Sequence, residues 1–114
     1  MITLPNINSD MIANNLTPFE PTHPGELIRD ELEFRGITQA KFAAAIGVSP
    51  SMLSEVINRK RAVNTELALL FEASLGIDAG IFLRLQNEYN MQMTKSNKKF
   101  MTRLENIRKI TAVL

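Results

Sequence analysis

Residues 38–61 read TQAKFAAAIGVSPSMLSEVINRKR, and this stretch decides the fold. Thr38 has the side chain of a helix N-cap, an apolar stripe follows at helical spacing as far as Ile46, and Gly47 is suited to end the helix. Ser49 can cap a second helix, because a proline stands directly after it at the first helical position. Two short helices joined by a tight glycine turn predict a helix-turn-helix, which presents its second helix outward.

The predicted second helix has an apolar inner side and a polar outer side. Ala43 in the helix before it, Val48 in the turn, and Leu53 or Val56 in the helix itself are expected to hold the pair together. The outer residues are Pro50, Ser51, Ser54, Glu55 and Asn58. Because these side chains are short or form hydrogen bonds, the helix can enter a DNA major groove without a steric bar.

Another helix is expected before this stretch. It begins at Pro24, carries Glu26 in its first turn, where the helix dipole favours a carboxylate, and ends at Gly36 in a left-handed cap. The residues expected on its inner side stand at 27, 28, 32 and 34–35.

Two further helices and an amphipathic tail are expected after the stretch. Asn64 or Thr65 opens a helix that Gly76 closes, and Asp78 caps the next one. Their expected inward side chains are Leu67, Leu70, Phe71, Leu75, Ile81, Phe82, Leu85 and Tyr89. A polar stretch at 94–99 is expected to be a linker. After it, apolar spacing predicts a last helix with Phe100, Leu104, Ile107, Thr111 and Leu114 on one side.

The pattern as a whole predicts an all-α fold of about five helices with a sixth at the C-terminal end, since no strand signal of useful length appears. Residues 1–22 are expected to be an arm, with a short helical turn near 10–16, because proline and asparagine favour turns and extended chain. Residues 23–93 are expected to form the helix-turn-helix domain, and residues 94–114 the linker and the amphipathic helix.

The net charge of +1 conceals an uneven distribution. Residues 1–23 carry −2, residues 24–93 carry −2, and residues 94–114 carry +5. A DNA-binding surface on the middle segment must therefore concentrate its positive charge. The run at 59–61, Arg59-Lys60-Arg61, follows the outward helix directly and is the expected place.

Several functional classes are disfavoured by the residue inventory. The absence of cysteine excludes disulfides and thiolate sites. No glycine-rich phosphate loop, nucleophile elbow or paired buried carboxylate is visible, so we expect no enzyme, no cofactor and no metal site. His23, the single histidine, is expected to begin a helix rather than to bind a metal. No run of 18 apolar residues and no secretion signal occur, so the expected location is the cytoplasm, away from a membrane.

The helix-turn-helix stretch resembles that of the lambda-repressor-like, or XRE, superfamily. HPGELI at 23–28, ITQA at 37–40, ELAL at 66–69 and FLRLQNEY at 82–89 stand in order around it. Together these motifs resemble the HigA antitoxin family. The similarity covers most of the chain and leaves out both tails.

The resemblance implies a set of DNA contacts. Gln39 would bind a phosphate, unless it is only an exposed helix-start residue. The base-edge and neighbouring backbone contacts would come from Ser49, Pro50, Ser51, Ser54 and Glu55, and the backbone contacts that follow from Asn58, Arg59, Lys60 and Arg61. Ser49 is a cap in either case, and Glu55 is either a contact, accepting from a cytosine amino group, or part of a solvated face. Many family members have glycine where this chain has Arg59, so a less tight helix exit is expected.

The resemblance also implies partners: double-stranded operator DNA, a cognate HigB-like ribonuclease toxin, and a second copy of the chain. The implied function is an antitoxin that represses its own operon as a dimer. A stand-alone transcriptional regulator without a toxin, and a scaffold that uses the fold for protein contacts alone, remain the alternatives. The tail at 94–114 is expected to pair with a second copy or to fold back. The arm, or the acidic helix surface at Glu26, Asp30 and Glu33, is expected to meet a basic toxin.

Overall fold

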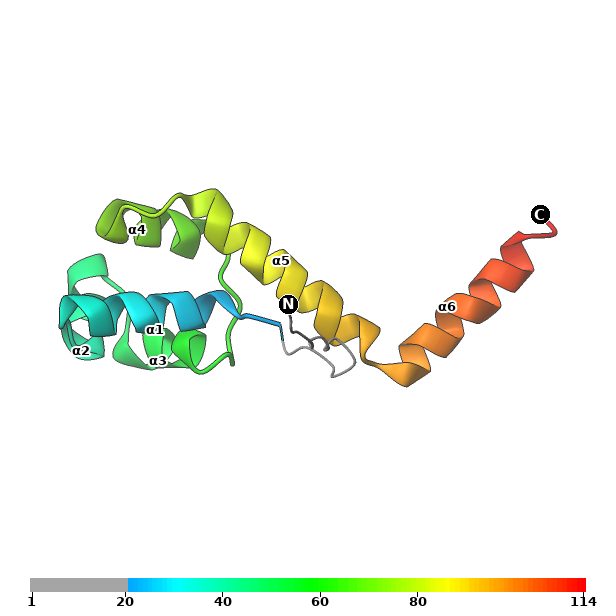
Figure 1. Ribbon diagram of the computed structural model, residues 1–114, viewed down its shortest axis with the longest axis horizontal. Helices are drawn as coiled ribbons and strands as arrows, with labels where there is room; N and C mark the ends of the chain where they lie inside the picture. Colours follow the sequence, from blue (N-terminus) through cyan, green and yellow to red (C-terminus); the bar gives the residue numbers. More distant parts are fainter. Residues whose placement is uncertain (1–20) are drawn as a thin grey trace, which may run out of the picture.

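The computed structural model describes residues 21–114, and all regular structure within that range is helical (Figure 1). The helices are α1 (Pro24–Arg35), α2 (Gln39–Ile46), α3 (Pro50–Ile57), α4 (Thr65–Leu75), α5 (Ala79–Lys95) and α6 (Lys98–Thr111). The all-α prediction is confirmed. The predicted arm, with its helical turn at 10–16, lies outside the described residues except for its last two.

The first four helices begin and end where their capping residues predict. The N-cap side chains of α2, α3 and α4 each accept a hydrogen bond from a first-turn N–H, at 3.2 Å for Thr38, 3.0 Å for Ser49 and 2.9 Å for Asn64. Gly36 and Gly47 end α1 and α2 with φ angles of 68° and 79°, a left-handed conformation that glycine adopts without a steric cost.

The core lies between α1, α2, α3, α4 and the first half of α5. Phe71 of α4 stands at its centre, with its ring centroid 6.3 Å from that of Phe42 and 5.4 Å from that of Phe82. The remaining buried apolar residues are Ile28, Leu32, Ala43, Leu53, Val56, Ile57, Val63, Leu67, Ala68, Leu75 and Ala79. Burial of this cluster stabilises the domain, because it removes apolar surface from water.

Three positions face a different way from the prediction. Positions 34–35 are exposed, with 89% of Phe34 accessible, because Phe34 lies about 200° around α1 from buried Leu32. Ile81 is also exposed. The inner position one turn after Phe82 is occupied by Gln86, a polar residue that the apolar pattern does not reveal.

The linker predicted at 94–99 is wrong. Only Ser96 and Asn97 separate α5 from α6. The Ser96 hydroxyl donates to the Met93 carbonyl at 2.7 Å, and Asn97 Oδ1 accepts from the Phe100 N–H at 3.0 Å. These polar side chains therefore end one helix and begin the next, which is the other role that serine and asparagine have near helix termini.

The start of α5 also differs in its capping. Asp78 occupies the N-cap position, but its side chain makes no capping hydrogen bond. Glu72 of α4 accepts from the Ala79 N–H at 3.0 Å instead, because α4 and α5 pack against each other. The predicted boundary is right, but the capping acceptor is Glu72 and not the predicted Asp78.

Helix α6 projects away from the rest of the described chain (Figure 1). It contains no buried residue, and it contacts the body through the neighbouring α5. Among residues 21–114, no helix is long and apolar enough to cross a membrane.

Candidate nucleic-acid interface

Helix α3 rests on α1 and α2 and leaves its opposite side open. Its buried side chains are Leu53, Val56 and Ile57. On the other side, Pro50, Ser51 and Asn58 are exposed, and Ser54 and Glu55 are half-buried. The structure confirms the predicted outward direction of these five residues, and their contact with DNA stays a prediction.

The start of α1 supports the end of α3 at very short range. Gly25 is buried, and a Cβ atom built on it would overlap the Val56 carbonyl oxygen and lie 2.8 Å from the Val56 carbonyl carbon. Only a residue without a side chain allows this approach. The position of α3 is therefore set directly by the backbone of α1.

The exit from α3 is a tight, hydrogen-bonded turn. The Arg59 N–H donates to the Val56 carbonyl at 3.1 Å, and the Lys60 N–H donates to the Glu55 carbonyl at 2.7 Å. This pattern is a Schellman motif, in which the residue after the cap is left-handed. Arg59 has a φ of 64°, in the left-handed region that glycine adopts most readily. The prediction of a less tight exit from α3 is therefore wrong.

Two carboxylates hold the arginines of the basic loop. Both Nε and Nη2 of Arg61 lie 2.8 Å from Glu55 Oε1, and Arg59 Nη1 lies 3.6 Å from Glu26 Oε2. All four side chains are partly exposed, so each pair contributes little to stability. The two ion pairs instead fix where the guanidinium groups lie, because Glu55 holds that of Arg61 beside α3 and Glu26 holds that of Arg59 beside α1.

Three of the remaining predicted contacts, Ser49, Ser54 and Asn58, have local hydrogen-bond partners. Ser49 Oγ caps α3 by accepting from the Met52 N–H. Asn58 Nδ2 donates to the Ser54 carbonyl at 2.9 Å and to Ser54 Oγ at 3.2 Å. Gln39 is exposed at the first position of α2. Ser51 is thus an exposed hydroxyl in the first turn of α3, whereas the Ser54 hydroxyl is already in a hydrogen bond.

His23 lies beneath this surface as the N-cap of α1. Its Nδ1 accepts from the Gly25 N–H at 2.9 Å, and its ring meets that of Tyr89 edge-on at 4.8 Å. Burial lowers the pKa of the imidazole, Glu26 opposes this shift, and Arg59 adds to it. The neutral form provides the acceptor that the cap requires, which confirms the helix-start role predicted for this histidine.

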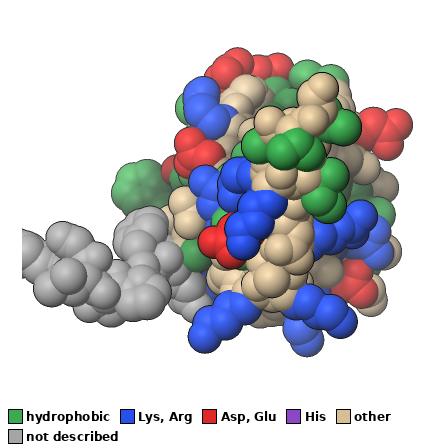
Figure 2. Space-filling model, turned by 90° about the vertical axis from the view of Figure 1, so that its right-hand side faces the viewer, with side chains coloured by type: hydrophobic (Ala, Val, Ile, Leu, Met, Phe, Trp, Pro, Cys, Tyr) green, Lys and Arg blue, Asp and Glu red, His purple; other side chains and the backbone are tan. Residues whose placement is uncertain are grey.

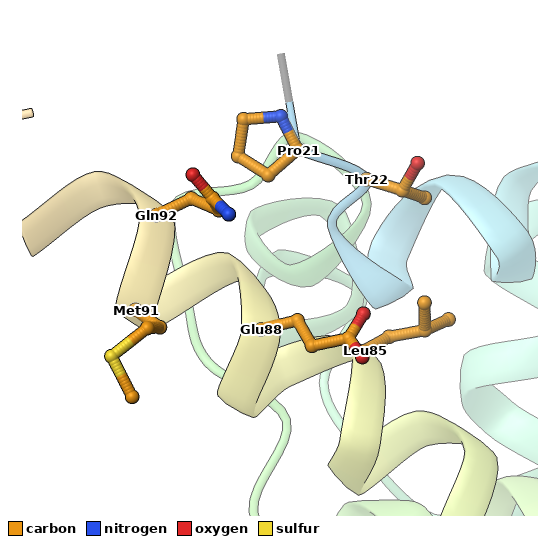
Figure 3. A pocket seen from close by; sticks show the side chains of 6 residues that line it. All are labelled: Pro21, Thr22, Leu85, Glu88, Met91 and Gln92. Atoms are coloured by element: carbon orange, nitrogen blue, oxygen red, sulfur yellow. The ribbon is translucent and has the colours of Figure 1, made fainter. Parts of the chain in front are cut away.

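A hollow of about 440 Å³ lies between the segment entering α1 and one side of α5 (Figure 3). Pro21 and Thr22 come from the first, and Leu85, Glu88, Met91 and Gln92 from the second. No residue of α3 lines it. The polar side of α3 with the loop 58–61, and not this hollow, is the candidate site.

The helix-turn-helix family model HTH_3 matches residues 28–82. Virulence-associated protein I of Dichelobacter nodosus is 33% identical over 78 residues, which cover 68% of this chain and 72% of that protein. An addiction module antidote protein of the HigA family from Coxiella burnetii is 26% identical, with a TM-score of 0.66, and the match covers 74% of this chain and 95% of that one.

This chain belongs to the XRE-type helix-turn-helix family, and its structural neighbours include HigA-type antitoxins. Antitoxin HigA of Pseudomonas aeruginosa, solved with the higBA promoter, is 29% identical, with a TM-score of 0.65 over 71% of this chain and 90% of that one. The lambda-repressor-like fold inferred from the sequence motifs is thereby confirmed.

The sequence did not reveal three features of this helix-turn-helix chain: the Glu55–Arg61 pair, the Glu26–Arg59 pair and the buried Gln86. The first joins residues six apart, and the second joins two separate helical elements, so neither follows from helical spacing. A glutamine within an otherwise apolar stripe of α5 is a usable signal for the third, since buried polar groups are normally hydrogen-bonded.

Proposed function

We propose that this chain is the antitoxin of a toxin–antitoxin pair and that, as a dimer, it represses the operon encoding both proteins. The observation that most directly supports sequence-specific DNA binding is that two surfaces, the polar side of α3 and the basic loop at 58–61, adjoin each other. The open polar side of α3 continues without a break into a rigid basic loop at 58–61. A helix in a major groove needs this combination, because base contacts specify the site while phosphate contacts fix the register.

The base-reading role is proposed for the first turns of α3. Ser51 is exposed there, and its hydroxyl both donates and accepts. Ser49, Pro50 and Ser54 would approach the groove edge beside it. Glu55 would accept from a cytosine amino group only by sharing its carboxylate with Arg61, so its contact is conditional on that pair.

The phosphate-binding role is proposed for the loop and for Gln39. Arg59, Lys60 and Arg61 follow α3 directly and would lie along the backbone that borders the groove. Asn58, tied to Ser54, would hold the loop at the helix end. Gln39 at the N-terminus of α2 would add a contact where the helix dipole also favours an anion.

Replacing Arg61 by alanine is expected to weaken binding to every DNA sequence alike. Loss of one phosphate contact should reduce the slope of log affinity against log salt by about 0.9. Replacing Ser51 by alanine should instead cost specific binding about 1–3 kcal/mol and leave non-specific binding nearly unchanged. The measurement is a titration of a duplex from the region upstream of the coding sequence, and of its scrambled version, at several salt concentrations.

The matched control is Arg84→Ala, which removes an exposed arginine from α5, outside the α3 surface. It should change neither duplex affinity by more than about twofold. An Arg61→Ala protein with an unchanged salt slope would contradict the docking of the loop on phosphates. If the unaltered chain binds neither duplex while remaining helical, DNA reading is lost as a function and the scaffold alternative replaces it.

The toxin-binding role is proposed for the exposed side of α1. Asp30 and Glu33 are exposed there, and Phe34 beside them is 89% accessible. A fully exposed aromatic ring within an acidic surface suits a basic protein partner, because aromatic anchors surrounded by complementary charge dominate many interfaces. Glu26 belongs to the same helix, but its carboxylate is already engaged by Arg59 and by the His23 N–H.

Replacing Phe34 by alanine is expected to weaken binding of the protein encoded by the adjacent gene by about 30-fold, the effect of losing an interface anchor worth about 2 kcal/mol. Leu69→Ala, at an exposed position of α4, is the control and should have little effect. Affinity is measured by calorimetry on the full chain. If Phe34→Ala and charge reversal at Asp30 and Glu33 all leave it unchanged while deletion of residues 1–20 abolishes it, the arm is the binding element. If the protein encoded by the adjacent gene does not bind this chain at all, the chain is a stand-alone regulator.

A further inference from the structure

Helix α6 is an amphipathic helix without a covering surface. None of its residues is buried, and Ile107 and Ile110 are 42% and 62% exposed. Leu114, three residues after the end of the helix, is 95% exposed. Figure 2 views the molecule from the α6 end and shows hydrophobic side chains exposed among lysines and arginines. An isolated helix of 14 residues is marginal in water, so this one needs a partner to be stable.

A narrow, mostly apolar seam runs along α6 and continues past its end. Its members are Phe100, Leu104, Ile107 and Thr111 of α6 and Leu114 beyond it, and they are separated by steps of four, three, four and three residues. This is the a/d spacing of a heptad, which fits another helix of the same kind. We propose that the seam of α6 pairs with the same seam of a second copy, and that the two helices run antiparallel.

The charges beside the seam decide the direction. Arg103 and Arg108 occupy the g and e positions that flank it. In a parallel pair, g of one helix meets e of the other, which would bring Arg103 against Arg108 of the second copy. In an antiparallel pair, g meets g and e meets e, so Arg103 lies beside Ile110 and Arg108 beside Met101 of the second copy. The antiparallel pair avoids both repulsions.

This pairing would supply the dimer of the proposed function. Its role in repression rests on that proposed function, but the pairing itself does not. The pairing is measured without DNA, so a failure of pairing is distinguishable from a failure of DNA reading.

The experiment is sedimentation equilibrium of the full chain, with two variants that add the same charge on different sides of α6. Ile107→Asp puts a carboxylate in the seam and should raise the dimer dissociation constant by about 100-fold or more, since an unpaired charge would be buried. Asn106→Asp puts it on the exposed side, one residue away, and should change the constant by less than about threefold. Ile107 is exposed in the single chain, so its replacement leaves the core intact.

Direction is tested by oxidation of single-cysteine variants, because the chain has no cysteine of its own. A mixture of Phe100→Cys and Thr111→Cys should form the mixed disulfide in preference to either homodimer. Predominant Phe100→Cys homodimers would show a parallel pair and overturn the stated direction. A chain that stays monomeric at all concentrations would overturn the pairing, whether or not it binds anionic phosphatidylserine vesicles through α6. A dimer whose dissociation constant Ile107→Asp leaves unchanged would also overturn it.

Discussion

Replacing Gly25 by alanine is expected to destabilise the fold by about 3 kcal/mol, as overpacking against a rigid neighbour does. For a domain of this size, that corresponds to a fall in Tm of roughly 12–24 °C. The three atoms nearest to the new methyl group belong to the backbone of Val56 and Ile57, so the closest clashes cannot be relieved by turning a side chain away. Helices α1 and α3 must separate, and operator affinity should fall with the stability.

Thermal unfolding followed by circular dichroism measures the effect, and Gly80→Ala is the matched control. A Cβ at Gly80 would meet the exposed Asp78 carboxylate at 2.8 Å, which can move into solvent. Because alanine is the better helix former, this variant should be as stable as the original chain or slightly more stable. Equal melting temperatures for the two variants would show that α1 and α3 do not approach as closely as described.

Replacing Gln86 by methionine is expected to cost about 2 kcal/mol, or roughly 8–16 °C in Tm. Gln86 Oε1 accepts from the buried Val63 N–H at 2.8 Å, and Nε2 donates to Asn90 Oδ1 at 2.9 Å. Methionine has a similar volume and no comparable acceptor, so the Val63 N–H loses its partner inside the protein. Val63 lies two residues after Arg61, and the basic loop should therefore loosen as well.

The control for this variant is Gln92→Met on the same helix, where the side chain is exposed and no buried N–H depends on it. Hydrogen exchange of the Val63 amide, alongside thermal unfolding, locates the effect. A Gln86→Met protein with unchanged melting and unchanged exchange at Val63 would mean that this hydrogen bond contributes nothing to the fold.

The helices from α1 to α4 could be predicted closely because their boundaries are local. Thr38, Ser49 and Asn64 cap helices through hydrogen bonds to residues three positions away, and a glycine follows the end of α1, α2 and α4. Such signals are contained within one turn of chain. The boundary between α5 and α6 was mistaken for a linker because serine, asparagine and lysine occur both in linkers and at helix ends.

The candidate site was only partly predictable. The outward direction of Ser51 and Asn58 follows from helical period, since Leu53 and Val56 must face the core. The ion pair of Glu26 with Arg59 depends on how α1 and α3 pack, and no local pattern contains that information. The left-handed conformation of Arg59 is likewise determined by its place in the turn and not by its intrinsic preference.

The exposure of α6 also has a consequence for turnover. A helix that buries none of its residues opens easily, and protease cleavage concentrates in segments that open. Within residues 21–114 of the single chain, the lysine- and arginine-rich segment from residue 95 onward is thus the first to become available for degradation. Pairing would cover it. At low protein concentration more chains are unpaired, so we expect faster cleavage at this end than at high concentration. The lifetime of the protein should therefore rise with its own concentration.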